Sequence, residues 1–121
     1  MTTPAEHSGL RCYDRDGQPI PLEQMAMLRL DDHYATVQQD DLLTPDGQTM
    51  WISTVWLGID HNFERGGEPV IFETMIFVRG YEDEYCARYS TAQDAQRGHD
   101  EIIDMLRRGV PLSELHLARK A

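Results

Sequence analysis

The chain of 121 residues has little cysteine, a single lysine and no long apolar segment. Its two cysteines, Cys12 and Cys86, form no CxxC pair, so we expect two reduced thiols rather than a disulfide or a zinc site. No apolar run approaches the roughly 20 residues of a membrane span. The N-terminal sequence MTTPAEHSGL also lacks the basic and apolar regions of a secretory signal. These absences predict a cytoplasmic protein that does not contact a membrane.

Positive charge is also scarce. The chain has 21 acidic residues and 11 basic ones, which gives a formal net charge of −10. Binding to nucleic-acid phosphates requires positive charge, so we expect no direct nucleic-acid binding. The acids occur in short runs, such as Asp40–Asp41 and Asp100–Glu101. Such runs are typical of solvated surface, but gathered on one face they would also suit a protein that mimics the charge of DNA.

The common catalytic sequence patterns are absent as well. The chain contains no P-loop, no GxGxxG and no GxSxG pattern. The hydroxyl pair Ser53–Thr54 falls in the middle of a predicted strand, which is a poor position for a nucleophile. The leading expectation is therefore a binding protein rather than an enzyme, with no cofactor and no resident metal.

Helical spacing of apolar residues, together with signals at the ends, predicts two helices. Pro21 suits the start of the short helix, a Ser90–Gln93 capping box suits the start of the long one, and Gly109 follows its end. Alternating apolar residues bounded by turn signals predict five strands. The predicted elements are strand 10–13, helix 21–30, strands 34–43, 49–57, 70–79 and 85–89, and helix 90–108.

The order of these elements predicts an α+β fold. The turn Thr44–Gly47 contains an Asp-Gly pair, which favours a hairpin. We expect an antiparallel sheet of four to five strands, with the long C-terminal helix packed on one face and a short N-terminal helix. The length suits one domain over residues 1–121, with 1–8 and 110–121 at its periphery. One long helix leaves the other face uncovered, which would suit a homodimer through the sheet or its edge.

Two polar residues interrupt apolar patterns and indicate a candidate site. Glu73 is a lone carboxylate in the apolar strand 70–79, and its isolated burial would cost several kcal/mol. His99 lies on the apolar stripe of the long helix, beside Gly98, a residue type that costs about 1 kcal/mol in a helix interior. A glycine there lets another backbone or a ligand come close. We expect Glu73 and His99 to meet between helix and sheet, as a structural pair or in a ligand site; alternatively, Glu73 is exposed.

The glycine-containing loop after the central strand carries the other candidates. Asp60 and His61 are adjacent on this loop, a common location for functional residues. With Glu73 and His99 they have the side chains of a divalent-metal site, but their spacing matches no compact metal motif. Hydrogen bonds that shape the loop are the alternative role for His61. Phe63 is the candidate apolar anchor for a partner or for a second copy of the chain.

Two segments carry a resemblance to known proteins. The sequences STVWLGIDHNF at Ser53–Phe63 and PVIFETMIF at Pro69–Phe77 resemble small proteins encoded by bacteriophages and prophages. Shorter similar stretches on both sides extend the resemblance over residues 13–103. Glu64–Arg65 departs from the plain glycine run in the loop of that group, which weakens the case for a phosphate contact through the loop.

The resemblance implies an intracellular accessory protein of a phage or prophage in a bacterial host, and it implies no mechanism. We therefore expect a non-enzymatic protein that binds a host protein or a small polar ligand. The expected site is the Asp60–Gly67 loop together with the region of Glu73 and His99. Two alternatives remain open. One is a small metal-dependent hydrolase that uses the four polar candidates, and the other is an acidic inhibitor that mimics DNA.

Overall fold

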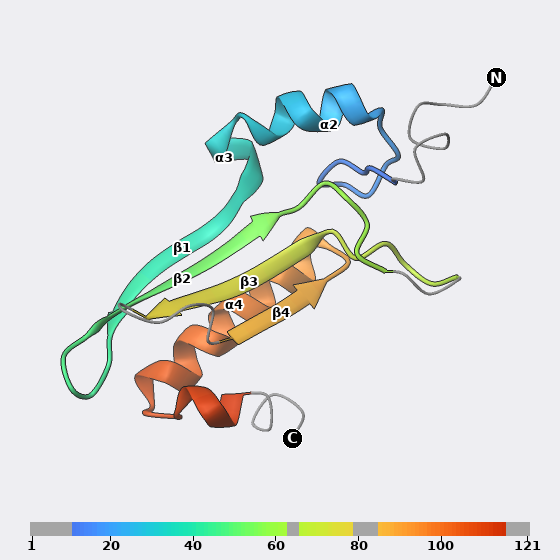
Figure 1. Cartoon of the computed structure of the whole chain (residues 1–121). Coiled ribbons are helices and arrows are strands. Elements are labelled where there is room, and N and C mark those ends of the chain that lie inside the picture. Colours follow the sequence, from blue (N-terminus) through green and yellow to red (C-terminus); the bar gives the residue numbers. More distant parts are fainter. Residues whose placement is uncertain (1–10, 63–65, 79–84, 116–121) are drawn as a thin grey trace.

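The computed structural model describes residues 11–62, 66–78 and 85–115, which form an α+β fold (Figure 1). Their antiparallel sheet has four strands in the order β1-β2-β3-β4, with a long C-terminal helix packed on it and a short N-terminal helix. The predicted fold class is confirmed. No helix of the described residues is long and apolar enough to cross a membrane. The elements are α2 (Leu22–Arg29), α3 (Asp32–Ala35), β1 (Thr36–Leu43), β2 (Thr49–Trp56), β3 (Phe72–Val78), β4 (Tyr85–Tyr89), α4 (Ala92–Arg107) and the 3₁₀ helix η1 (Leu112–Glu114).

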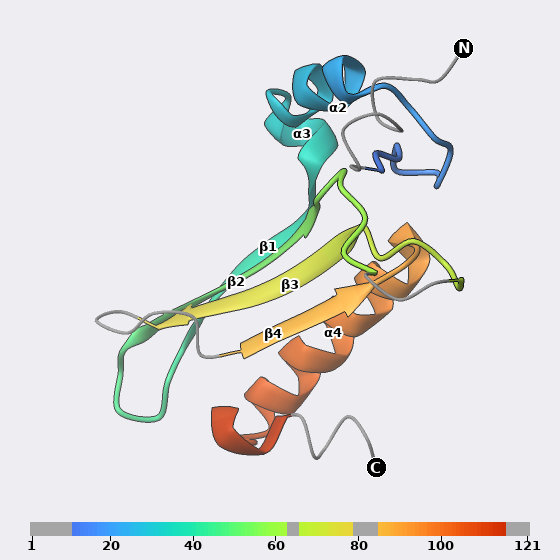
Figure 2. The same ribbon diagram turned by 45° about the vertical axis from the view of Figure 1, so that its right-hand side comes forward.

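The sheet has one face covered by α4 and one face over which no described helix packs (Figure 2). Side chains alternate between the two faces along each strand. In β3, the side chains toward α4 are buried, whereas those between them are only half-buried. The side toward α4 is called the helix face below, and the other side the open face.

The β1–β2 hairpin is confirmed. The Gly47 N–H donates to the Thr44 carbonyl at 2.9 Å, and Gly47 has a φ of 86°, which glycine adopts without strain. The next strand also runs antiparallel, and its register places Thr54 of β2 directly opposite Thr74 of β3. The two hydroxyl groups therefore lie together under α4.

Helix α4 has the predicted end but a different N-cap. The Ser90–Gln93 capping box is wrong, because the side chain of Thr91 accepts from the Asp94 N–H at 3.0 Å. The helix begins one residue later than the box requires, so Thr91 is the residue whose hydroxyl reaches a free N–H of the first turn. Gly109 follows the C-terminal end with a φ of 88°, as predicted.

Two hydrophobic clusters lie on the helix face. In the first, the sheet packs against the C-terminal half of α4, where Ile52 and Ile102 are fully buried. Leu115 is also fully buried there, so the segment directly after α4 packs into the core. The second cluster surrounds Trp56, whose indole N–H donates to the Tyr13 carbonyl at 3.0 Å. This bond ties the N-terminal segment to the end of the sheet.

The predicted strand 10–13 is not a strand in its described part. It forms only isolated bridges, from Cys12 to Ile59 and from Tyr13 to Pro19. The chain turns back on itself after Tyr13, so these residues cannot extend along the sheet. Cys12 is a free and buried thiol, and burial raises its pKa.

Strand β1 begins at Thr36, two residues later than predicted. The preceding residues form the short helix α3, which the sequence analysis did not anticipate. Its N-cap is Asp31, whose carboxylate accepts from the N–H groups of His33 and Tyr34. A cap of this kind satisfies N–H groups that lack a partner at the start of a helix, which favours one helical turn before the strand.

Gly98 allows α4 to lie against Tyr89. A Cβ atom at position 98 would lie 2.3 Å from Cε1 of Tyr89 and 2.4 Å from its hydroxyl oxygen. Both distances are too short for real contacts, so only glycine leaves room for the tyrosine in this position. The close approach expected at this glycine occurs, but the approaching group is a side chain rather than a backbone or a ligand.

Gly98→Ala is expected to lower the free energy of unfolding, although alanine is favoured over glycine in a helix by about 1 kcal/mol. The clash with Tyr89 must displace the ring, and we expect a net loss of about 1–3 kcal/mol. Urea denaturation followed by circular dichroism measures this loss. Tyr89→Leu is the companion variant, because the double variant should lose less stability than the two single losses added together. A Gly98→Ala protein as stable as the wild type would contradict the assigned contact.

Candidate functional site

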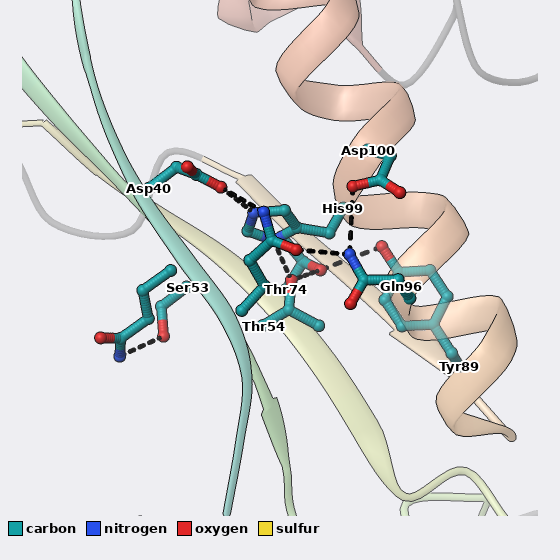
Figure 3. Close-up of polar contacts among 10 residues, drawn as sticks. Asp40, Ser53, Thr54, Thr74, Tyr89, Gln96, His99 and Asp100 are labelled. Carbon is teal, nitrogen blue, oxygen red and sulfur yellow. Dashed lines mark hydrogen bonds and ion pairs between the residues drawn. The ribbon is translucent and has the colours of Figure 1, made fainter. Parts of the chain in front are cut away.

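His99 is the centre of a polar network inside the protein (Figure 3). Its side chain is fully buried between α4 and the sheet. Nε2 lies 2.7 Å from Oδ2 of Asp40 on β1, and Nδ1 lies 2.7 Å from Oγ1 of Thr54 on β2. A buried polar group without a partner is costly, so these two contacts make His99 compatible with its apolar surroundings.

On its buried side, the network continues through three hydroxyl groups. Oγ1 of Thr54 lies 2.5 Å from Oγ1 of Thr74, which lies 3.0 Å from the hydroxyl oxygen of Tyr89. Both threonines are fully buried. Each hydroxyl can donate one hydrogen bond and accept another, so neighbouring members of this series satisfy one another.

On its outer side, the network reaches the surface of α4. The amide of Gln38 donates to Oδ2 of Asp40 at 2.8 Å. The amide of Gln96 donates to Gln38 at 2.5 Å and to Asp100 at 3.1 Å. All four strands and α4 are thereby connected by one polar chain, which consists of Asp100, Gln96, Gln38, Asp40, His99, Thr54, Thr74 and Tyr89.

Asp40 sets the charge of the polar chain, and its side chain is 29% exposed. The hydrogen bond from His99 lowers the pKa of the Asp40 carboxyl; partial burial opposes this shift, and the Gln38 amide and the Arg107 charge support it. Asp40 is therefore ionised at neutral pH, and Nε2 of His99 carries the proton that it donates to the carboxylate. When the imidazole is neutral, Nδ1 accepts a hydrogen bond from Thr54.

The order of carboxylate, imidazole and hydroxyl matches the arrangement that activates a nucleophile in acyl-transfer enzymes. Here, however, the hydroxyl of Thr54 is fully buried and is also bonded to Thr74. A neighbouring groove of about 250 Å³ is lined by Asp40, Asp104 and Arg107, and Thr54 is not part of its lining. A molecule in this groove would meet the carboxylate and not the hydroxyl. The geometry therefore supports a structural role for the polar chain rather than nucleophilic catalysis.

Glu73 does not meet His99, so that prediction is wrong. Thr74 points to the helix face, and its neighbour Glu73 therefore points to the open face. There Oε1 of Glu73 accepts from Nε of Arg88 at 3.2 Å and from the thiol of Cys86 at 3.1 Å. The prediction failed because apolar side chains occupy both sides of β3, so the pattern alone does not identify the side under the helix.

Asp60 and His61 hold the loop after β2 in shape. Oδ1 of Asp60 accepts from the backbone N–H groups of Asn62 and Val70, both at 2.8 Å. Nδ1 of His61 donates to the Ile59 carbonyl at 2.8 Å. Because Asn62 and Val70 stand at opposite ends of the loop, the carboxylate joins these two ends. This agrees with the loop-shaping alternative considered for His61.

The predicted site residues thus lie in separate places. Among the described residues, no group of three or more His, Cys, Asp or Glu side chains is placed to hold a metal ion. Phe63 lies outside the part of the chain that the structure describes. The acidic run on β1 is also divided, because Asp40 faces α4 and Asp41 faces the open side. These positions give little support to a metal centre or to charge mimicry.

The open face presents its described side chains in four rows that cross the strands. From one row to the next, the members include Leu43 and Thr49; then Asp41, Trp51 and Phe77; then Gln39, Ser53, Met75 and Cys86; then Val55, Glu73 and Arg88. Trp51 is 41% exposed and stacks on Phe77, with ring centroids 5.1 Å apart. Most of the large apolar members belong to the two central strands, and the exposed Leu43 of β1 adds another at the edge.

Comparisons of the chain with protein-family models, with curated proteins and with solved structures found no match. Two features of the described residues stand out, the polar chain and the open face. The polar chain connects the sheet to its helix and reaches the surface at Asp40 and along α4. The open face presents the exposed Trp51 to other molecules.

The partners of His99 were not among the residues predicted from the sequence, although the sequence carries a signal for them. Thr54 interrupts the apolar side of β2 between Ile52 and Trp56, and Thr74 interrupts the apolar side of β3 in the same way. Two polar residues on neighbouring strands, with a histidine on the apolar stripe of a helix, indicate a shared buried network. The sequence does not single out Asp40 in this way, because Asp40 belongs to an acidic run that is typical of solvated surface.

Thr54→Val keeps the shape of the side chain but removes its hydroxyl. We expect a loss of about 1–3 kcal/mol in the free energy of unfolding, because Nδ1 of His99 and the hydroxyl of Thr74 lose a buried partner. Thr49→Val is the matched control, since Thr49 is an exposed residue of the same strand. Its effect should stay within about 0.5 kcal/mol in urea denaturation. Equal stability of the two variants would show that the buried hydroxyl is not needed.

Asp40→Asn should reduce stability in a pH-dependent way. Folding lowers the pKa of Asp40, so the carboxylate stabilises the folded state above its unfolded-state pKa of about 3.9. This contribution is lost as the pH falls through the lower folded-state value. The difference in free energy of unfolding between wild type and variant should therefore shrink as the pH falls below about 5. Asp41→Asn removes the same charge without touching His99, and it should show a smaller pH dependence.

Proposed function

We propose that the protein is a non-enzymatic binding protein that docks another protein on its open face. The observation that carries this proposal is the exposed stack of Trp51 on Phe77, on the two central strands of a sheet face over which no described helix packs. Aromatic side chains in central positions supply much of the binding energy of protein interfaces. The proposed surface includes Glu73, as expected from the sequence. It does not include His99, which lies on the helix face.

The composition of the open face favours a protein over a small ligand. Polar side chains of this face lie on both edge strands, with Gln39 and Asp41 on β1 and Arg88 on β4, next to the apolar Leu43 at the end of β1. An apolar centre inside a polar rim is typical of surfaces that bind proteins. Small-ligand sites are concave, whereas the two grooves found along α4 lie on the other side of the sheet.

The charge of the chain argues against a second copy as the occupant. Two chains that each carry a formal charge of −10 repel each other as they approach. Asp41 lies in the same row as Trp51, so the carboxylates would be brought close to the aromatic centre of the contact. We therefore assign the open face to a different protein, and a homodimer is one outcome of the test.

The resemblance to phage and prophage proteins supplies the setting of this proposal. We infer an accessory protein that acts in the cytoplasm of a bacterial host and binds a host protein. No cofactor is needed for such a role. The hydrolase alternative is less favoured, because Asp60, Glu73 and His99 each have a separate set of partners.

Trp51→Ala is expected to weaken binding of the partner by about tenfold or more, because it removes the central aromatic anchor. Proteins captured from a bacterial lysate by the wild-type chain are purified and titrated against both chains by calorimetry. Met27→Ala is the matched control, since Met27 is an apolar side chain that is 68% exposed on α2. This control should bind like the wild type.

Two results would contradict the proposal. A purified partner that binds Trp51→Ala and wild type with equal affinity would show that the open face is not the binding surface. A dimer detected by sedimentation, and lost in Trp51→Ala but not in Met27→Ala, would assign the face to a second copy instead.

A further inference from the structure

We propose that the row Asp41–Trp51–Phe77 on the open face recognises a cationic side chain, arginine or lysine, of the partner protein. This inference rests on the proposed function and specifies the chemistry of the contact. It predicts a basic partner whose guanidinium or ammonium group lies over Trp51 and reaches Asp41.

The strand register supplies the geometry of this row. Asp41 pairs directly with Trp51, and Trp51 pairs directly with Phe77. Residues paired in this way across antiparallel strands have Cβ atoms about 4.5–5.5 Å apart. An exposed carboxylate therefore stands beside a stacked aromatic pair, and Trp51 keeps 41% of its surface accessible.

The chemistry of the row matches a cation. The faces of aromatic rings attract guanidinium and ammonium groups, and tryptophan does so most strongly. A carboxylate next to the ring accepts a charge-assisted hydrogen bond from the same cation. Trp51 and Asp41 can therefore contact one arginine or lysine side chain together, one through the ring and the other through charge.

The charges around the row also favour a cation. Glu73 and Arg88 form an ion pair with a distance of 3.2 Å, so their charges offset each other. Asp41 has no ion-pair partner among the described residues, in contrast to Asp40, which is bonded to His99. The described rows of the open face thus carry one net negative charge, located beside Trp51. The net charge of −10 on the whole chain attracts a basic partner and repels phosphate groups.

The test uses two short peptides as probes. One contains a single arginine between glycines, with both ends blocked, and the other contains citrulline, which keeps the shape of arginine but lacks its charge. Binding is followed by NMR through the indole N–H of Trp51. The indole of the fully buried Trp56 serves as the internal reference. We expect the arginine peptide to bind about five-fold more tightly than the citrulline peptide.

Three variants locate the contact. Asp41→Asn and Trp51→Leu should each weaken binding of the arginine peptide by about three- to five-fold. Asp100→Asn removes the same charge from α4, on the other side of the sheet, and should leave binding unchanged. Equal binding of the two peptides, or equal effects of Asp41→Asn and Asp100→Asn, would overturn the inference.

The outcomes also separate this inference from the proposed function. If a partner protein needs Trp51 but is unaffected by Asp41→Asn, the open face binds proteins without the proposed cation contact, and the inference is wrong while the proposed function stands. If the partner binds Trp51→Ala normally, the proposed function itself is contradicted.

Discussion

A fully buried histidine needs a hydrogen-bond partner for each ring nitrogen, and much of the structure depends on how His99 meets this requirement. Asp40 serves Nε2 and Thr54 serves Nδ1, so β1 and β2 are both bonded to α4. Thr54 contacts Thr74 in turn, and Thr74 contacts Tyr89. Each of the four strands contributes one of these groups, which is why a single histidine can fix the position of the helix on the whole sheet.

The polar chain also makes the register of the sheet specific. A slip of one residue in a strand would move its inward side chains to the opposite face. Thr54 or Thr74 would then leave the helix face, and His99 would lose the partner of Nδ1. Gly98 adds a steric condition, because it gives the Tyr89 ring the space that it needs against α4. Apolar packing alone tolerates many arrangements, whereas these hydrogen bonds are complete in only one.

The two faces of the sheet consequently have different roles. On the helix face, the buried polar groups hydrogen-bond to one another. Asp40, His99 and Thr54 resemble a catalytic arrangement only in the order of carboxylate, imidazole and hydroxyl. The open face has Trp51 and Phe77 on its two central strands, with Asp41 and Arg88 on the edge strands. The polar chain and α4 bind the strands on the helix face. The open face on the other side of the same strands is therefore a rigid surface. That rigidity is favourable for binding, since little order has to be gained when a partner docks.

The sequence by itself determined the order and type of the four sheet strands and of helices α2 and α4, because these depend on interactions between residues that are close along the chain. The turn Thr44–Gly47, the spacing of apolar residues and the helix ends are local signals of this kind. The sequence did not predict α3, and its expected strand 10–13 forms isolated bridges only. The sequence did not determine which side of β3 lies under α4, since both sides are largely apolar, and Glu73 was therefore assigned to His99. Only the tertiary structure decided this point. Strand pairing brings Thr54 and Thr74 together beneath the histidine and gives Glu73 a partner on the neighbouring strand, and no pattern within one strand contains that pairing.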